Sequence, residues 1–175
     1  NDGMNGKKGS AYDGGHRVPF LMHWPAGKFT KARGIGKLTA HIDILPTLME
    51  LCDVEGTADS KYDGKSLLPL LRANKKNEPW EDRVIITDSQ RRLDPIKGKS
   101  SSTMIQRWRL SNGEELYDMK QDAGHTTDVA SQHPGVVSRL RAAYDAWWYD
   151  ISPSFVIDER PVLGHDAANP TQLTG

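Results

Sequence analysis

The first sixteen residues place the strongest constraint on the fold, because five of them are glycines and most of the others are polar. Such a run lacks the apolar periodicity of a helix or strand, and glycine allows sharp turns and close backbone approach, so the pattern predicts a loop. Two interpretations stay open at this point: a flexible surface loop, or a functional loop that brings Lys7 or Lys8 to a ligand.

The composition limits the classes of protein to consider. Apolar residues make up 37% of the 175 residues, so we expect a lean core that a neighbouring part completes. The 23 basic residues balance the 23 acidic ones, which argues against a nucleic-acid binder driven by overall charge. No stretch reaches the roughly 18 apolar residues of a membrane span. A single cysteine, Cys52, excludes an internal disulfide and a multi-cysteine zinc site.

The first half of the chain predicts one short strand and one helix. Residues 17–24 are largely apolar, with prolines near both ends, and we expect a strand there. The helix is expected over 43–52, with Asp43 as its N-cap and Pro46 in its first turn. Residues 66–71 predict a short apolar turn.

The second half predicts a small antiparallel sheet and a longer helix. Strands are expected over 83–88, 102–110 and 115–118, and Asn112-Gly113 is the strongest short signal for a hairpin. The helix begins near Pro134 and carries an apolar face that ends in Trp147-Trp148 and Ile151, so we expect it to pack on the sheet with at least one tryptophan mostly buried.

Most candidate catalytic groups have a simpler structural interpretation. Cys52 has no activating neighbours and is expected to be a buried structural thiol. None of the six histidines has the spacing of a metal motif, and Asp118, Asp122 and Asp128 lack the pattern of a calcium loop, which favours solvated charges and caps. Lys8 differs, because a lysine ammonium among glycines suits a tetrahedral oxyanion such as sulfate or phosphate.

Four segments then resemble one family in the same order. Residues 8–20, KGSAYDGGHRVPF, closely resemble the K-G-x-x-x-[DE]-G-G-x-R-x-P segment of the sulfatases, which belong to the alkaline-phosphatase-like superfamily. Residues 23–27, 41–48 and 116–129 resemble later sulfatase motifs: the W-P-[AG]-G continuation, the D-[ILV]-[LV]-P-T-L helix start and the E-L-Y-D-L…D…E-x-x-[DN]-[VL] stretch. The resemblance continues to about Leu173.

This resemblance implies an α/β fold class: the C-terminal part of an alkaline-phosphatase-like sulfatase fold, with a small antiparallel sheet packed by a C-terminal helix. It implies three parts. Residues 1–75 would form the C-terminal end of the catalytic α/β domain, 76–153 the small sheet-and-helix subdomain, and 154–175 an extended, truncated tail. In the whole protein, residues 17–24 would join a large mixed sheet and the 43–52 helix would pack on it.

The resemblance also implies that parts of the active site are missing. Sulfatases carry a Cys-x-[Pro/Ser]-x-Arg motif whose Cys or Ser is oxidised to formylglycine, and Cys52 does not match it. The family's metal ligands are an Asp-Asp pair and a later Asp-Asn pair, and Asn1-Asp2 has the reverse order and lies too close to Lys8. We therefore expect a fragment that is inactive alone and binds no Ca²⁺ alone, although Ca²⁺ is expected in the full-length enzyme.

Site roles carry over residue by residue. Lys8 matches the family lysine that contacts the sulfate group, where its charge would offset the charge on the transferring sulfuryl group. His16 would face the substrate or pack within the loop. Four residues would fix the loop, with an Asp13–Arg17 ion pair conceivable: Asp13, Gly14, Gly15 and Arg17.

Three functions remain open. The first is a fragment of a sulfuric ester hydrolase of the arylsulfatase kind, whose partners are the missing N-terminal part of the same protein and a sulfate ester, with sulfated carbohydrate among the candidates. The second is a piece of a phosphodiesterase or phosphonate hydrolase of the same superfamily. The third is a non-catalytic module that binds an anion or a carbohydrate. The chain itself does not indicate a compartment, and the resemblance implies a secreted or periplasmic protein.

Overall fold

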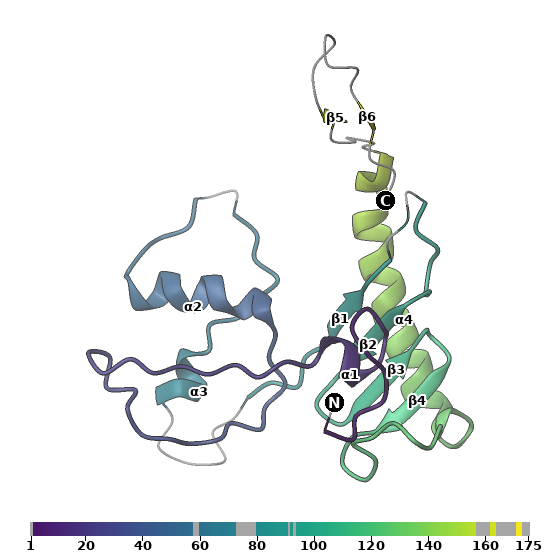
Figure 1. The fold of residues 1–175 in the computed structure, drawn as a ribbon, viewed down its shortest axis with the longest axis horizontal. Helices are drawn as coiled ribbons and strands as arrows, with labels where there is room; N and C mark the ends of the chain where they lie inside the picture. Colours follow the sequence, from purple (N-terminus) through teal and green to yellow (C-terminus); the bar gives the residue numbers. More distant parts are fainter. Residues whose placement is uncertain are drawn as a thin grey trace. The chain divides into compact units, whose positions relative to one another are not determined.

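A computed structural model describes residues 2–57, 60–72, 80–90, 92, 94–156, 162–163 and 171–172 (Figure 1). The chain divides into two compact units. Residues 1–17 and 86–175 form one, here called the sheet unit, and residues 18–85 form the other, here called the helical unit. The predicted assignment of 1–75, 76–153 and 154–175 to parts of a longer protein stays a prediction.

The sheet unit is built on four strands in the order β1-β2-β3-β4, which confirms the small sheet predicted from the sequence. The strands are β1 (Ile85–Asp88), β2 (Ser101–Met104), β3 (Trp108–Ser111) and β4 (Glu115–Asp118). The pairs β2–β3 and β3–β4 are antiparallel. One strand was predicted wrongly: residues 102–110 form parts of two strands, joined where the Ile105 amide donates to the Trp108 carbonyl at 3.0 Å. Gln106-Arg107 in that turn carries no glycine, proline or asparagine, so nothing in the sequence marked it.

The turn between β3 and β4 is the one that the sequence predicted. Asn112 and Gly113 both have positive φ, 53° and 70°, and the Glu114 amide donates to the Ser111 carbonyl at 3.0 Å. Both central residues of a type I′ turn need this left-handed conformation, which asparagine and glycine adopt most readily.

Helix α4 (Pro134–Ile151) covers one face of this sheet (Figure 1). Leu110 and Leu116 from the strands and Leu140 from the helix are almost fully buried, and Val137 and Tyr144 are buried beside them. Trp147 and Trp148 are only partly buried. Both rings pack against Tyr144, and Phe155 also packs against Trp148. The residues of α4 that are buried are instead Val137, Leu140 and Tyr144.

The opposite face of the sheet holds the N-terminal segment. Residues that pair across an antiparallel ladder point to the same face, so the pairs Arg109–Tyr117 and Ser111–Glu115 share a face opposite that of Leu110 and Leu116. The short helix α1 (Asp13–His16) and the loop before it lie there (Figure 1). The remaining elements of this unit are η2 (Ala130–Gln132), η3 (Ser152–Val156), β5 (Val162–Leu163) and β6 (Thr171–Gln172).

The helical unit contains η1 (His41–Asp43), α2 (Ile44–Leu51) and α3 (Leu68–Arg72), which confirms the predicted helix and places a short helix at the predicted apolar turn. Asp43 lies at the N-cap position of α2, but its carboxylate does not cap that helix. It is fully buried and accepts hydrogen bonds from the Ala40 amide at 2.8 Å, from the Lys65 amide at 2.9 Å and from Arg83.

Two expectations for this unit were wrong for the described chain. Residues 17–24 form no strand, and only a single bridge joins Trp24 to Phe29, because an extended segment needs a neighbouring strand for its backbone groups. Cys52 is exposed rather than buried, since it follows the last residue of α2.

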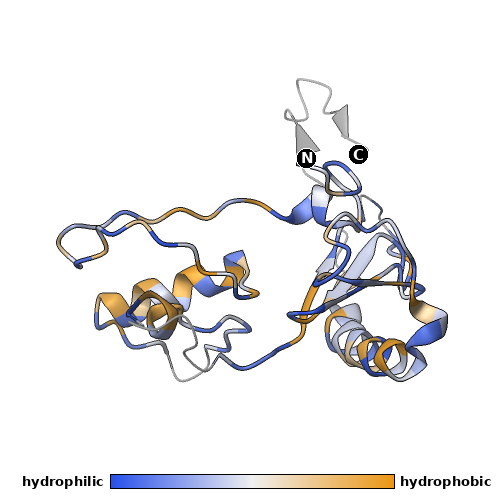
Figure 2. Ribbon diagram, turned by 90° about the horizontal axis from the view of Figure 1, so that it is seen from below, coloured by the Kyte–Doolittle hydropathy of each residue, from blue (hydrophilic) through white to orange (hydrophobic). Residues whose placement is uncertain are grey.

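Apolar side chains of the helical unit remain uncovered. Leu45 and Leu48 of α2 are 53% and 47% exposed, and Val18 and Leu21 are 78% and 91% exposed. Figure 2 shows α2 as a largely hydrophobic helix. The expectation that 17–24 and α2 join a larger sheet concerns the longer protein and stays a prediction.

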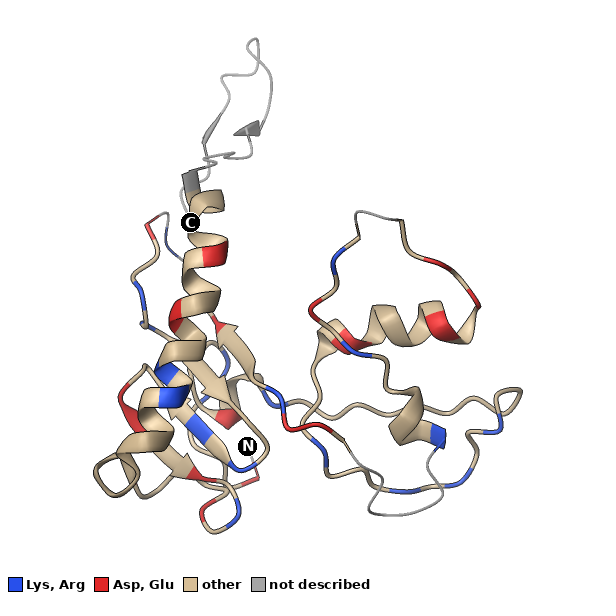
Figure 3. Ribbon diagram, turned by 180° about the vertical axis from the view of Figure 1, so that it is seen from behind, with Lys and Arg blue, Asp and Glu red and all other residues tan. Residues whose placement is uncertain are grey.

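Basic and acidic segments are interspersed in both units (Figure 3), as the equal numbers of the two kinds of residue suggest. None of the helices among the described residues combines the length and the apolar character needed to cross a membrane.

Candidate functional site

The glycine-rich loop has a defined conformation in which Lys8 occupies a tight turn. The Ser10 amide donates to the Lys7 carbonyl at 2.9 Å, and the Lys7 amide donates to the Ser10 hydroxyl at 3.1 Å. Gly6 and Gly9 both have a φ of 85°, which favours glycine. Lys7 and Lys8 are exposed, and no hydrogen bond or ion pair from the described residues reaches the Lys8 ammonium.

Two glycines of α1 allow this turn to pack directly on the helix. A Cβ on Gly15 would lie 2.4 Å from the Ser10 carbonyl oxygen and 2.8 Å from that of Lys7. A Cβ on Gly14 would lie 2.5 Å from the Asn5 carbonyl oxygen, which accepts the Gly14 amide at 2.8 Å. These neighbours are backbone atoms, so any side chain at Gly14 or Gly15 would push the loop away from α1.

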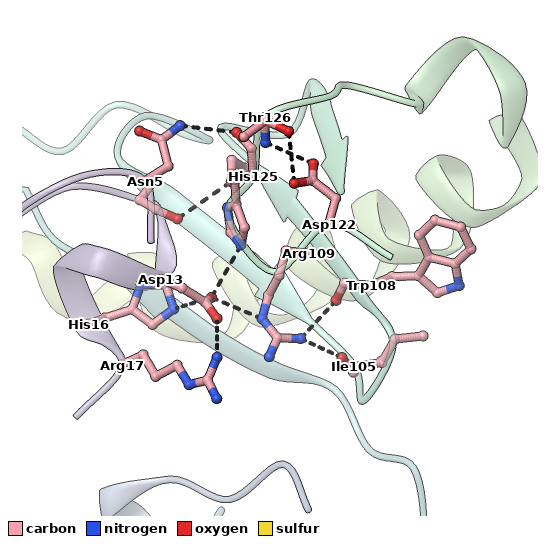
Figure 4. A network of polar contacts seen from close by, with 12 residues as sticks. Asn5, Asp13, His16, Arg17, Ile105, Trp108, Arg109, Asp122, His125 and Thr126 are labelled. Atoms are coloured by element: carbon pink, nitrogen blue, oxygen red, sulfur yellow. Dashed lines mark hydrogen bonds and ion pairs between the residues drawn. The ribbon is translucent and has the colours of Figure 1, made fainter. Parts of the chain in front are cut away.

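Asp13 is the centre of a buried charge cluster (Figure 4). Its Oδ1 accepts a hydrogen bond from Arg109 Nε at 3.1 Å and lies 3.5 Å from His16 Nε2 and 3.6 Å from His125 Nε2. Its Oδ2 lies 3.6 Å from Arg17 Nη1. The Asp13 side chain is 1% exposed, so the Arg109 guanidinium and the other nitrogen-containing side chains around it replace the water that it would otherwise need.

These neighbours determine the ionisation of Asp13. Burial by itself raises the pKa of this carboxyl, but the contact with His16 and the charges of Arg109, His125 and His16 outweigh burial and hold the pKa at about 2. Asp13 is therefore an anion over the whole physiological pH range.

A second set of contacts holds the loop at a turn formed by residues 122–127. The Asn5 amide donates to the Gly124 carbonyl at 3.2 Å, and Asn5 Nδ2 donates to the His125 carbonyl at 3.3 Å. The turn is itself fixed by Asp122, whose carboxylate accepts the amides of Thr126 and Thr127 at 2.7 and 2.8 Å. Burial raises the pKa of Asp122, but these hydrogen bonds outweigh burial and lower it.

Two tyrosines also hold the loop on the sheet through a shared glutamate. The Tyr12 hydroxyl donates to Glu115 Oε2 at 2.6 Å, and Tyr117 donates to the same oxygen at 3.1 Å. The hydrogen bond to Glu115 raises the pKa of Tyr12, and burial together with Glu115 raises that of Tyr117. Both phenols therefore stay protonated and able to donate.

Comparison with known proteins identifies the family. The model of the N-sulphoglucosamine sulphohydrolase C-terminal family matches residues 7–143, which is most of the chain. The chain belongs to the sulfatase family. The match begins at Lys7, includes α1, the whole helical unit and strands β1 to β4, and ends within α4.

Individual sulfatases are similar over long stretches. An N-acetylgalactosamine-6-O-sulfatase of Bacteroides thetaiotaomicron is 30% identical over 77% of this chain and 28% of its own length. A Delta 4,5-hexuronate-2-O-sulfatase of the same organism is 31% identical over 78% of this chain and 29% of its own length. Human Arylsulfatase D is 42% identical over 38% of this chain and 11% of its own length. The chain thus spans less than a third of these relatives.

Solved structures show the same fold. The crystal structure titled Ps i-CgsB matches with a TM-score of 0.70 at 24% identity, over 84% of this chain and 32% of the other. A Bacteroides thetaiotaomicron structure, designated a 6S-sulfatase in a study of glycosaminoglycan metabolism, matches with a TM-score of 0.63 at 23% identity, over 83% of this chain and 32% of the other. The small sheet with its C-terminal helix is therefore part of a sulfatase fold.

The sulfatase residues predicted from the sequence fall in the loop and in α1. Lys8 lies in the exposed turn, Asp13, Gly14 and Gly15 in α1, and the conceivable Asp13–Arg17 ion pair is present. The His16 side chain is 18% exposed, and neither of its ring nitrogens has a hydrogen-bond partner among the described residues. The roles of these residues toward a substrate stay predictions.

Four residues that hold this loop were not predicted from the sequence: Arg109, Glu115, Tyr117 and His125. Arg109 is 96 positions from Asp13, and no local pattern connects two residues so far apart. The aspartates at the end of β4 and in the loop after it were predicted to be caps and solvated charges. Asp128 does cap backbone amides, since it accepts those of Leu116 and Ala130. Asp118 is buried in an ion pair with Arg107 rather than solvated.

A calcium ion binds where several oxygen ligands come together. Among the described residues, no group of three or more histidine, cysteine, aspartate or glutamate side chains could hold a metal ion. The Asp13 cluster carries the Arg109 guanidinium at 3.1 Å, a position where a cation would be repelled. The described residues therefore do not fit a calcium site.

Proposed function

We propose that this chain is the C-terminal part of a sulfuric ester hydrolase and supplies the lysine, Lys8, that contacts the sulfate group of the substrate. The observation that carries the proposal is the exposed ammonium on a loop whose backbone is held in place from both sides. The backbone that carries this charge is fixed before the substrate arrives, and the flexible lysine stem lets the ammonium reach a tetrahedral anion.

The chemistry expected of Lys8 is electrostatic. As the bond between sulfur and the ester oxygen breaks, negative charge grows on the departing oxygen and remains on the sulfuryl oxygens. A fixed ammonium next to those oxygens stabilises that charge, and the loss of one such contact typically costs about 10²–10³ in kcat. His16 lies next to Asp13 in the same loop region, and we propose that it faces the substrate.

The rest of the reaction belongs to residues outside this chain. We propose that the formylglycine nucleophile and the calcium ligands of the intact enzyme lie in the part of the sulfatase that these 175 residues do not span. The chain alone is then inactive, and its first partner is that remaining part. The substrate is a sulfate ester, with sulfated carbohydrates foremost because two of the similar sulfatases are named for sugar substrates. A secreted or periplasmic location fits such substrates.

Two matched variants of the intact enzyme test the proposal. Lys8→Ala and Lys7→Ala remove the same charge from neighbouring exposed positions of one loop. With nitrophenyl sulfate or a sulfated sugar as substrate, we expect Lys8→Ala to lower kcat about 10²–10³-fold and Lys7→Ala to have a much smaller effect.

The outcomes separate the alternatives. If Lys7→Ala is the crippling change and Lys8→Ala is near neutral, the site assignment is wrong. Turnover of a phosphate diester or phosphonate without turnover of any sulfate ester would instead favour the related hydrolases of the superfamily. Turnover of an aryl sulfate by the purified 175-residue chain would refute the proposal that it is inactive alone.

A further inference from the structure

The glycine-rich loop that carries Lys8, here called the lysine loop, packs on side chains from the second half of the chain. On the sheet face opposite α4, four residues of β3 and β4 lie in two ladder pairs, and all of them contribute to the seat of residues 11–13: Arg109, Ser111, Glu115 and Tyr117. The loop's conformation therefore depends on the sheet as well as on its own glycines.

Arg109 is a rigid part of this seat. Its Nη1 donates to the carbonyl oxygens of Ile105 at 2.6 Å and Trp108 at 3.2 Å, which fixes the guanidinium plane against the β2–β3 turn. Its Nε then donates to Asp13 Oδ1 at 3.1 Å. A guanidinium fixed by backbone carbonyls holds the carboxylate at one place on the sheet (Figure 4).

His125 supports Asp13 from another direction. Its side chain is completely buried, stacks on the Tyr117 ring at 4.7 Å with an interplanar angle of 16°, and brings Nε2 to 3.6 Å from Asp13 Oδ1. Burial lowers the pKa of His125, as do Arg109 and His16, while Asp13 and Asp122 act in the opposite direction. The ring is therefore neutral near neutral pH and can lie close to the Arg109 cation.

Helix α1, which begins at Asp13, packs directly on the turn that contains Lys8. Asp13 begins α1, and Gly15 in the same turn of helix packs on the carbonyls of Lys7 and Ser10, the two residues that close the Lys8 turn. The contact is made by these two carbonyls and by the short Ser10 side chain, whose hydroxyl accepts the Lys7 amide, so a shift of α1 on the sheet must shift the Lys8 turn with it.

We propose that Arg109 and His125 are positioning residues for Lys8, acting through Asp13 to hold the lysine loop in one place on the sheet. The inference rests on the proposed function of Lys8. Neither residue needs to touch the substrate, because each acts through the buried carboxylate.

The chain offers a matched control for each residue. Arg107 lies in the turn between β2 and β3, but it pairs with Asp118 at 2.6 Å and contacts the Trp108 ring on the α4 side. His133 likewise packs on the Trp108 ring at 4.7 Å. The experiment compares Arg109→Gln with Arg107→Gln, and His125→Ala with His133→Ala, in the intact sulfatase.

We expect Arg109→Gln and His125→Ala to lower kcat on nitrophenyl sulfate about 10²-fold with a smaller change in KM, because a displacement of about 1 Å at a reacting centre costs about that much. The two controls should stay within about threefold of the parent. A double variant, Asp13→Asn with Arg109→Gln, removes both buried charges. Its melting temperature should recover while its kcat stays low, since neither charge then holds the loop.

Amide hydrogen exchange gives a readout that does not require activity. The Asn5 and Gly14 amides donate the backbone hydrogen bonds that dock the loop, and the Ser10 amide donates the one that closes the Lys8 turn. The exchange of these three amides should accelerate in Arg109→Gln and His125→Ala but not in the two controls. Recovery of both stability and kcat in the double variant would mean that the pair is only structural, and would overturn the inference.

The same series separates this inference from the proposed function. If Lys8→Ala lowers kcat but Arg109→Gln and His125→Ala behave like their controls, the positioning role is refuted and the role of Lys8 stands. If Lys8→Ala has no effect on kcat, the proposed function fails, and the exchange of the loop amides alone decides whether Arg109 and His125 hold the loop.

Discussion

Acid should loosen the lysine loop through the protonation of Asp13, and the variant Asp13→Asn reveals how much of the stability depends on this charge. The pKa of Asp13 is lowered in the folded chain from its ordinary value of 3.8 to about 2. A group with a lowered folded pKa contributes stability that is fully present above its unfolded pKa and is lost as the pH falls through the folded pKa. The relevant pH window therefore runs from about 4 down to about 2.

The magnitude follows from the size of that shift. At about 1.4 kcal/mol per pKa unit, the ionised carboxylate contributes on the order of 2 kcal/mol at neutral pH. Because the loss is gradual, roughly half of this contribution should be gone at about pH 3. Asparagine cannot ionise and removes the negative charge that pairs with the buried Arg109 guanidinium, so the variant should be less stable than the parent at neutral pH.

The assay is urea unfolding of the 175-residue chain and its Asp13→Asn variant at several pH values between about 6 and 3. The titration of His125, which faces Asp13, would also change with the Asp13 charge, so both proteins carry His125→Gln. Without the His125 charge the pKa of Asp13 is lowered less, and His16 and Arg109 remain to lower it. We expect the difference in unfolding free energy between them to shrink by about 1 kcal/mol across this range. A difference that is the same at every pH would refute the argument that buried positive groups hold Asp13 ionised.

Three further predictions concern packing. Gly15→Ala should destabilise the chain by about 1–3 kcal/mol in urea unfolding, because its Cβ would lie within 2.8 Å of backbone oxygens of both Ser10 and Lys7; an unchanged midpoint would contradict the loop packing. Leu140→Ala empties a fully buried position of α4 and should cost about 2–5 kcal/mol in thermal or urea unfolding, whereas a cost near zero would mean that α4 does not cover the sheet. Leu48→Lys should change the stability of this chain by less than about 0.5 kcal/mol, because Leu48 is 47% exposed, yet should lower the melting temperature of the intact sulfatase if α2 packs there.

Local signals in the sequence predicted the elements whose geometry is decided by neighbouring residues. Asn112-Gly113 predicted its turn because both positions need positive φ, and Pro134 predicted the first turn of α4 because proline tolerates that position. The helix near Pro46 was found for the same reason. In each case, the sequence neighbours alone supply the physical cause.

The remaining features depend on contacts between distant residues. The chain has no signal for the turn at Gln106-Arg107, which is set by strand pairing rather than by the turn residues. Cys52 was predicted to be buried because it follows an apolar stretch, but the face of α2 is not covered by the described residues. The partner of Asp13, Arg109, could be identified only once the sheet was known.

The two ends of the family resemblance therefore meet in one structural unit. Residues 8–17 carry the loop motif and residues 116–129 carry the last motif, and the sheet unit brings them together through Asn5, Asp13 and the turn that contains His125. The contacts described above for this loop, with Arg109, Glu115 and the 122–127 turn, all lie within the sheet unit. Substitutions in β3 and in the 122–127 turn should therefore change kcat and the exchange of the loop amides more strongly than substitutions in the helical unit, although that unit follows the loop directly in the sequence.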